Sequence, residues 1–110
     1  MATLSSVRYR AFPNSLSESV TTVPAVAADL ATTDAMIWQI MVCNTTAGAL
    51  TFTLTDKQAT PRYILPAVSI AGNTTYIVSW PEGQYCDSGI SWVASGVGLQ
   101  ASLVGGYKNA

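Results

Sequence analysis

The stretch that decides the fold runs MIWQIMVC over residues 36–43, NTTAGA over 44–49 and LTFTLTD over 50–56. In the third part apolar residues alternate with threonine, and a strand places alternate residues on opposite faces. The middle part is rich in residues that favour turns. Residues 36–56 therefore predict a β-hairpin. Its first arm is apolar at every position but one, so we expect both faces of that strand to be covered, in the centre of a sheet or against a partner chain.

The rest of the chain has the pattern of short strands divided by turns. Residues 18–26 are β-branched and contain Pro24, which cannot donate to a ladder, so they predict an edge strand or the end of one. Only residues 27–31 have helical propensity, and they last barely one turn. After the hairpin, strands are predicted over 62–65, 74–80, 88–94 and 99–104, with turns over 71–73, 81–85 and 95–98.

About seven strands without a real helix predict an all-β fold, either an antiparallel β-sandwich or a small jelly roll. Residues 1–17 are assigned to an extended N-terminal arm and residues 18–110 to a single β-sandwich domain. Alternation within the strands supplies the predicted core, which consists of Leu50, Phe52, Leu54, Val78, Ile90, Trp92, Leu99 and Leu103.

The composition points to a surface that meets other chains. Charged residues make up 10% of the chain, against about 25% in a typical soluble domain. So few charges protect a lone monomer poorly against aggregation, and we therefore expect other chains to cover much of the surface. A monomer with a Ser/Thr surface is the alternative. Lys and Arg do not cluster beyond Arg8 and Arg10, which argues against a nucleic-acid partner. The longest nearly apolar run, residues 35–43, is too short to span a membrane.

No catalytic constellation is visible in the sequence. The chain contains no histidine, which removes the commonest general base and the commonest transition-metal ligand. Two cysteines cannot form a zinc site without histidine. The nearest carboxylate pair, Glu82 and Asp87, lies in or beside one exposed turn, where nothing is placed to raise the pKa of either group. We therefore expect no enzymatic activity, no cofactor and no small-molecule substrate.

The cysteines and the asparagines of two N-T-T motifs have ordinary structural interpretations. Residues 1–5 have neither the basic nor the apolar region of a secretory signal, so we expect synthesis in a cytoplasm. In that compartment Cys43 and Cys86 are expected to be buried thiols, with a disulfide as the alternative. Asn44 and Asn73 each begin a glycosylation sequon, and we interpret both as turn residues.

The candidate partner-binding residues fall in two segments. Alternation over residues 7–12 places Arg8 and Arg10 on one side of an extended segment and Tyr9 on the other, which suits strand addition to a neighbour's sheet edge; a loosely ordered terminus is the alternative. Trp80 and Tyr85 flank the predicted turn and suit an interface anchor, with core packing or a stacking surface for a sugar as alternatives. The full set is Arg8, Tyr9, Arg10, Phe12, Trp80 and Tyr85.

Several runs of the sequence resemble small β-sandwich proteins of tailed-bacteriophage virions. These runs are VCNTT (42–46), LTFTL (50–54), YILPAVSI (63–70) and GISWVAS (89–95). The resemblance covers residues 36 to about 107, and the N-terminal third departs from it. It implies a virion component that is assembled in the bacterial cytoplasm in many copies and has no enzymatic activity. Its partners would be further copies of itself, as a homo-oligomer, and other virion proteins such as the major capsid protein.

Two positions in a virion fit this resemblance. The extended N-terminus favours a capsid decoration (cement) protein, because an arm can reach across subunits and strengthen the shell by strand addition. A ring-forming neck or tail component would equally explain the doubly apolar strand over residues 36–42. A carbohydrate-binding or adhesion module is the further alternative.

Overall fold

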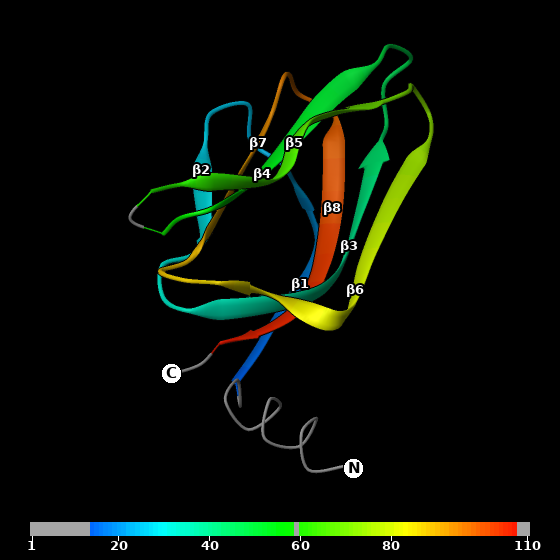
Figure 1. Cartoon of the computed structure of the whole chain (residues 1–110). Helices are drawn as coiled ribbons and strands as arrows, with labels where there is room; N and C mark the ends of the chain where they lie inside the picture. Colours follow the sequence, from blue (N-terminus) through cyan, green and yellow to red (C-terminus); the bar gives the residue numbers. More distant parts are fainter. Residues whose placement is uncertain (1–13, 59, 108–110) are drawn as a thin grey trace.

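The computed structural model describes residues 14–58 and 60–107 (Figure 1). Within these ranges the chain forms eight strands and no helix. The strands are β1 (Asn14–Thr22), β2 (Ala28–Ala31), β3 (Ala35–Asn44), β4 (Leu50–Asp56), β5 (Arg62–Ile70), β6 (Thr75–Cys86), β7 (Ile90–Ala94) and β8 (Leu99–Tyr107). The predicted all-β fold is confirmed, with one strand more than the sequence indicates.

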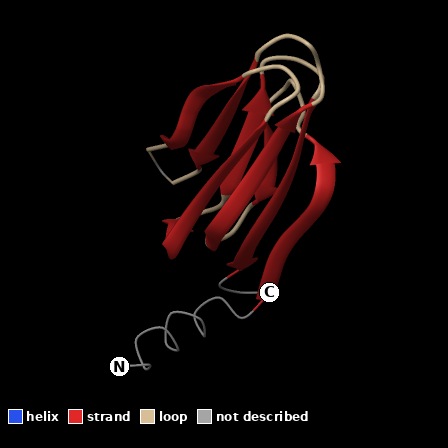
Figure 2. Cartoon of the chain, turned by 90° about the vertical axis from the view of Figure 1, so that its right-hand side faces the viewer, coloured by secondary structure: helices blue, strands red, loops and turns tan. Residues whose placement is uncertain are grey.

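The strand order identifies the architecture. The strands form two antiparallel sheets of four, sheet A with the order β1-β8-β3-β6 and sheet B with the order β2-β7-β4-β5. The first strand pairs with the last, the second with the second-to-last, and so on inward: β1·β8, β2·β7, β3·β6 and β4·β5. A ribbon folded across two sheets in this way is a jelly roll, the second of the two predicted architectures. Figure 2 shows the two layers, with loops gathered at one end.

The predicted hairpin over residues 36–56 is wrong, although both of its strands exist. β3 lies in sheet A between β8 and β6, whereas β4 lies in sheet B between β7 and β5. Both strands turn apolar side chains into the same interior, so burial brings them face to face and not edge to edge. The position of β3 inside its sheet agrees with the expected central strand.

Residues 28–31 form a strand and not the helical turn that their propensity suggests. They make up β2, which pairs with β7 at the edge of sheet B. Ala31 is buried in the core and Leu30 packs against it, so tertiary contacts outweigh a helical preference that spans only about one turn.

The predicted turn over residues 81–85 is also wrong, because β6 continues through it to Cys86. The pairing with β3 jumps there from Gln39↔Ser79 to Ile37↔Gln84, so several residues of β6 lie opposite one residue of β3. The extra residues of β6 form a bulge at Gly83, which adopts a φ of 84°, a left-handed conformation that glycine accepts readily. Strong turn signals here mark a bulge within a strand.

Sheet A begins before the predicted domain boundary at residue 18. β1 starts at Asn14, which pairs with Tyr107, so residues 14–17 belong to an edge strand of sheet A and not to the arm. β1 ends two residues before Pro24, in agreement with the predicted edge strand. Residues 1–13 of the predicted arm lie outside the described residues.

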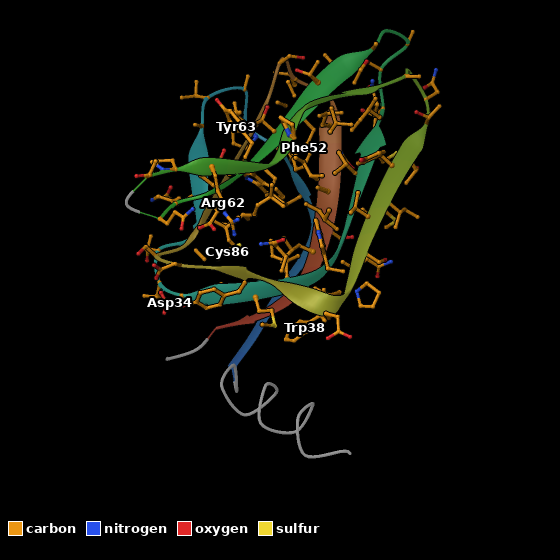
Figure 3. All side chains as sticks on the ribbon, in the orientation of Figure 1. Asp34, Trp38, Phe52, Arg62, Tyr63 and Cys86 are labelled. Carbon is orange, nitrogen blue, oxygen red and sulfur yellow. The ribbon has the colours of Figure 1, made fainter. Side chains whose placement is uncertain are left out.

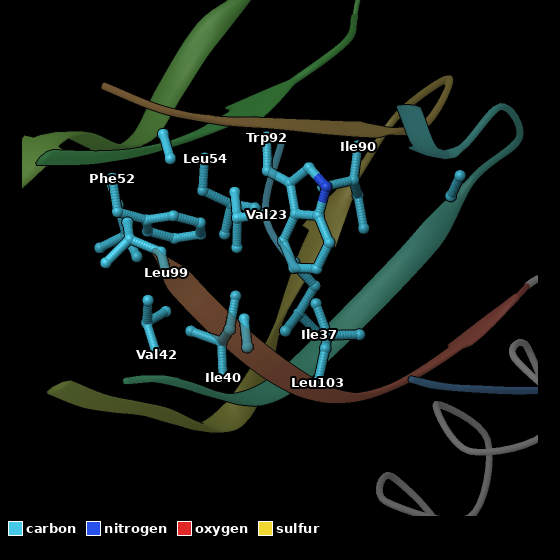
Figure 4. Close-up of a cluster of buried hydrophobic side chains, with 14 of the residues drawn as sticks. Val23, Ile37, Ile40, Val42, Phe52, Leu54, Ile90, Trp92, Leu99 and Leu103 are labelled. Carbon is cyan, nitrogen blue, oxygen red and sulfur yellow. The ribbon is translucent and has the colours of Figure 1, made fainter. Parts of the chain in front are cut away.

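The core fills the space between the two sheets (Figure 4). Six of the eight predicted core residues are buried, whereas Leu50 and Val78 are half-buried at its margin. The rings of Phe52 and Trp92 meet edge to face with centroids 6.2 Å apart, a favourable aromatic arrangement. β3 adds buried residues that the prediction omitted, including Ile37 and Ile40, and Val23 joins them from the loop after β1.

Candidate interaction surface

The outer face of sheet A carries exposed apolar side chains on β3, β8 and the first half of β6, where the described outward positions are uncharged. Met41 on β3, Ile77 on β6 and Val104 on β8 are 39%, 54% and 50% exposed. Met41 lies directly opposite Ile77 and, on its other side, opposite Ser102. We use "outer face" for the outward positions of β3, β6 and β8, namely Gln39, Met41, Cys43, Thr75, Ile77, Ser79, Gln100, Ser102 and Val104. The outward side of β3 is therefore not covered by the described part of its own chain.

The strand at the margin of this face is β6. Among the described strands it pairs only with β3, and its other long side is an edge of sheet A. Between residues 75 and 79 the pairing with β3 runs without a break, so this half of β6 is a regular strand. Its side chains alternate, with Ile77 exposed and both Tyr76 and Val78 half-buried against the core.

The two predicted contact residues on β6 have different surroundings. Trp80 is half-buried and packs against the core, as its alternative interpretation held. Tyr85 is 41% exposed, and its hydroxyl donates a hydrogen bond to Asp34 Oδ2 at 2.9 Å. The other carboxylate oxygen of Asp34 accepts from the backbone N–H of Ser88 at 2.9 Å, which ties the start of β3 to the loop after β6.

The hydrogen bond to Asp34 also changes the acidity of Tyr85. It raises the pKa of Tyr85 to about 12, and partial burial and the negative charges of Asp34, Asp87 and Asp56 add to the shift. The phenol is therefore a protonated hydrogen-bond donor at neutral pH and is not available as a base. Trp38 and Met36 pack nearby, on the side of Gly83 where a Cβ would touch the Met36 sulfur.

Two ion pairs lie near the C-terminal end of β4. Asp56 is 1% exposed, and its carboxylate accepts from Arg62 Nε at 3.2 Å and from the N–H of Gln58 at 3.3 Å. Beside it, Lys57 Nζ lies 2.7 Å from Asp29 Oδ2 on β2. These contacts join the strands at one end of sheet B. Figure 3 shows Arg62 on the same side of the molecule as Cys86 and Asp34.

The two cysteines are free thiols at opposite ends of the β3·β6 pair, Cys43 on β3 and Cys86 on β6. Cys86 pairs in register with Ala35 at the start of β3, whereas Cys43 lies next to its end. At about 3.4 Å per residue this is a separation of roughly 27 Å, so the thiols are not neighbours. Burial, followed by the charge of Asp56, raises the pKa of the Cys86 thiol to about 12, against a smaller lowering by Arg62. The predicted burial holds for Cys86, whereas Cys43 is only half-buried.

Asn44 and Thr45 together connect three loops at the opposite end of the sandwich. The Asn44 contacts come first. The side chain of Asn44 is fully buried, and its amide nitrogen donates to the carbonyl oxygens of Gly48 and Ile70, each at 2.9 Å. Its amide oxygen accepts from the N–H of Thr46 at 2.9 Å and from the Thr46 hydroxyl at 2.7 Å. Thr45 then bonds the Gly98 carbonyl through both its N–H and its hydroxyl. The interpretation of this N-T-T motif as a structural turn is confirmed.

The described residues offer little for catalysis. No group of three or more Cys, Asp or Glu side chains in the described ranges is placed to hold a metal ion. Within the same ranges, every buried side-chain nitrogen and oxygen has a hydrogen-bond partner. Glu82 and Asp87, the carboxylate pair of the sequence analysis, are exposed at the end of β6 and in the loop after it. The described ranges contain no helix that is long and apolar enough to cross a membrane.

The remaining predicted contact residues, Arg8, Tyr9, Arg10 and Phe12, lie outside the described residues, and their role stays a prediction. The sequence analysis missed Ile77 and Val104 as surface residues. Strict alternation around each of them was the signal that could have placed them opposite the core.

No protein-family model, no curated protein and no solved structure matches this chain.

Proposed function

We propose that the protein is a non-enzymatic structural component of a tailed-bacteriophage virion, and specifically a capsid decoration protein that stabilises the shell through subunit contacts. The observation that carries the proposal is the outer face of sheet A. It sets Met41, Ile77 and Val104, all partly exposed, among uncharged side chains on a chain with only 10% charged residues. Contiguous exposed apolar patches of this kind often mark sites of protein–protein contact.

The fold and the sequence resemblance support the same role. Eight strands in jelly-roll order are an architecture that viral capsid proteins share with lectins and cupins, so the fold is compatible with a shell component but does not by itself select one. The runs VCNTT and GISWVAS resemble virion proteins, and they correspond to the end of β3 and to β7.

Binding to shells is the direct test. Purified protein is mixed with empty capsids of the phage that encodes it, and the shells are sedimented and their bound protein is quantified. A decoration protein is expected to saturate at a fixed ratio to the major capsid protein and to raise the temperature at which the shells fall apart. Deleting residues 1–13 should weaken binding if the arm reaches a neighbour. Failure to bind shells, with absence of the protein from purified virions, would contradict the proposal.

The copy number separates decoration from the neck or tail alternative. A neck or tail ring would be present in virions at a few copies, and its antibody label would lie at the portal or along the tail. A carbohydrate-binding module is the second alternative, because lectins share the jelly roll and Tyr85 is exposed on its rim. That module would change its tryptophan fluorescence on addition of oligosaccharides, whereas a decoration protein would not.

A further inference from the structure

The four edge strands of the sandwich differ in how they are protected. An edge strand presents unpaired N–H and C=O groups to any other strand, and proteins usually block it with short length, charge, proline or a bulge. β2 is four residues long and its Asp29 is paired with Lys57. β5 begins with Arg62 and carries Pro66 before Ala67, whose φ is 40°. The pairing of β1 with β8 is broken between residues 18 and 21.

The first half of β6 has none of these devices. Residues 75–80, TYIVSW, contain no charge and no proline, and their pairing with β3 is regular up to Ser79. A six-residue strand is about 20 Å long, enough for a stable additional pairing. The glycine bulge at Gly83 and the charge of Glu82 come only after this segment. We propose that residues 75–79 pair antiparallel with the same residues of a second copy, across a two-fold axis at Ile77.

The core supports a partner on this side. Seven apolar residues pack against the core without being fully buried, and five of them lie on β5 and β6: Ile64, Val68, Tyr76, Val78 and Trp80. The interior is thus least covered along the side where β5 and β6 form the free edges of the two sheets. A second copy joined at β6 brings its own Tyr76, Val78 and Trp80 to this side and removes more of that apolar surface from water.

Charge explains why the occupant is a second copy. In a two-fold interface each residue near the axis meets its own symmetry mate, so any charge there repels itself. Residues 75–80 and the outer face beside them carry no charged side chain. With Ile77 opposite Ile77 of the second copy, exposed residues meet exposed residues and half-buried ones meet half-buried ones. Met41, directly behind Ile77, extends the apolar stripe across both copies.

This inference deepens the proposed function, since it names the surface through which the expected homo-oligomer forms. The test is sedimentation equilibrium of the full chain over a range of concentrations. The wild type is expected at twice the chain mass of 11.6 kDa, or at an even multiple of it. Ile77→Lys places two like charges at the axis and should raise the dissociation constant at least tenfold. Val26→Lys, at a residue 78% exposed in the loop before β2, is the matched control and should leave the dimer unchanged.

Amide hydrogen exchange provides a second readout that does not depend on any variant. The outward N–H groups of residues 75–79 should be protected at high concentration and should lose this protection on dilution, whereas the amides of β3 stay protected. A wild type that is monomeric at every concentration would overturn the inference, as would an Ile77→Lys variant that dimerises normally. Loss of the dimer on deleting residues 1–13 with Ile77→Lys unaffected would assign the contact to the arm and also overturn it.

Shell binding is measured separately on the wild type and on Ile77→Lys. A dimer that does not bind shells would sustain this interface and contradict the virion role. A monomer that binds shells would support the virion role and contradict this interface.

Discussion

The buried amide of Asn44 should be one of the largest single contributors to stability outside the core. Asn44→Ala removes four hydrogen bonds, two donated to the carbonyls of Gly48 and Ile70 and two accepted from Thr46. Each is worth about 1 kcal/mol net, and a buried group left without a partner costs about 1–3 kcal/mol. The Ile70 carbonyl is the group left buried, since the other three bonds are partly accessible to water. Water can replace the amide at those three bonds, so most of the loss comes from the Ile70 carbonyl, and we expect a total of about 3 kcal/mol.

The assay is urea unfolding followed by tryptophan fluorescence, with thermal unfolding beside it. For a domain of this size a loss of about 3 kcal/mol lowers the melting temperature by roughly 12 °C. Asn44→Asp keeps the acceptor for Thr46 but turns an oxygen toward two carbonyl oxygens, so it should be at least as destabilised. Asn73→Gly is the matched control in the second N-T-T motif, because that residue is exposed and has a φ of 56°. It should change stability by less than about 0.5 kcal/mol.

A loss below about 1 kcal/mol for Asn44→Ala would refute the reasoning. It would mean that water replaces the amide at every one of its partners, so that the loops at this end of the sandwich are held by their backbones alone.

Three further predictions follow from the structure. Cys43 should react with a thiol reagent in the native protein while Cys86 reacts only on unfolding, as labelling followed by peptide mass spectrometry would show; equal rates would contradict the observed burial. The raised pKa values of Tyr85 and Cys86 mean that the folded chain keeps protons that the unfolded chain loses, so these two groups should lower the unfolding free energy as the pH rises from about 9 to about 12. Tyr85→Phe should make that fall shallower. Gly89→Ala should destabilise by at least about 2 kcal/mol, because the φ of 117° is strained for alanine and its Cβ would meet the β2 backbone, whereas Gly48→Ala, with open space around it, should be nearly neutral in the same urea titration.

The sequence was a good guide to strands and a poor guide to their partners. Alternation over residues 50–56 correctly predicted which side of β4 is buried, because a period of two records the contrast between two faces. It contains no information about which strand lies alongside. The turn-like residues 44–49 therefore suggested a hairpin, whereas the chain uses them to cross from sheet A to sheet B. The buried contact that directs the crossing, Asn44 to Ile70, joins residues 26 apart and is not visible in a local pattern.

The turn predicted from proline and glycine at residues 81–85 was wrong for a related reason. Pro81, Glu82 and Gly83 are strong turn signals, yet β6 passes through them. A proline at a sheet edge loses no ladder bond on its free side, and a glycine with positive φ can bend a strand without ending it. Because β6 is an edge strand, both exceptions apply. Whether a strand is at an edge depends on the complete topology, so this feature could not be read from the segment itself.

The candidate surface was partly predictable. The doubly apolar pattern of residues 36–43 predicted that the outward side of β3 requires a cover, and the structure leaves Met41 on that side 39% exposed. Arg8 and Arg10 lie outside the described residues, so their expected contacts remain predictions. Ile77 went unnoticed because strand β6 was assigned from its half-buried aromatic residues, which occupy the opposite face.

The few charges of this chain are distributed in a way that favours one side for contact. In the described ranges Asp29 pairs with Lys57 and Asp56 with Arg62, all on sheet B or the loop that joins its strands. Asp34 and Asp87 lie in loops near Tyr85, and the charged residues of sheet A are Glu18 on β1 and Glu82 on the second half of β6. The outward positions of β3, β8 and the first half of β6 have none. Desolvating an uncharged face costs little, whereas covering the charged end would require a partner for every ion. The proposed association through the first half of β6 would therefore leave the sparse charges of the chain in water, where they oppose further aggregation.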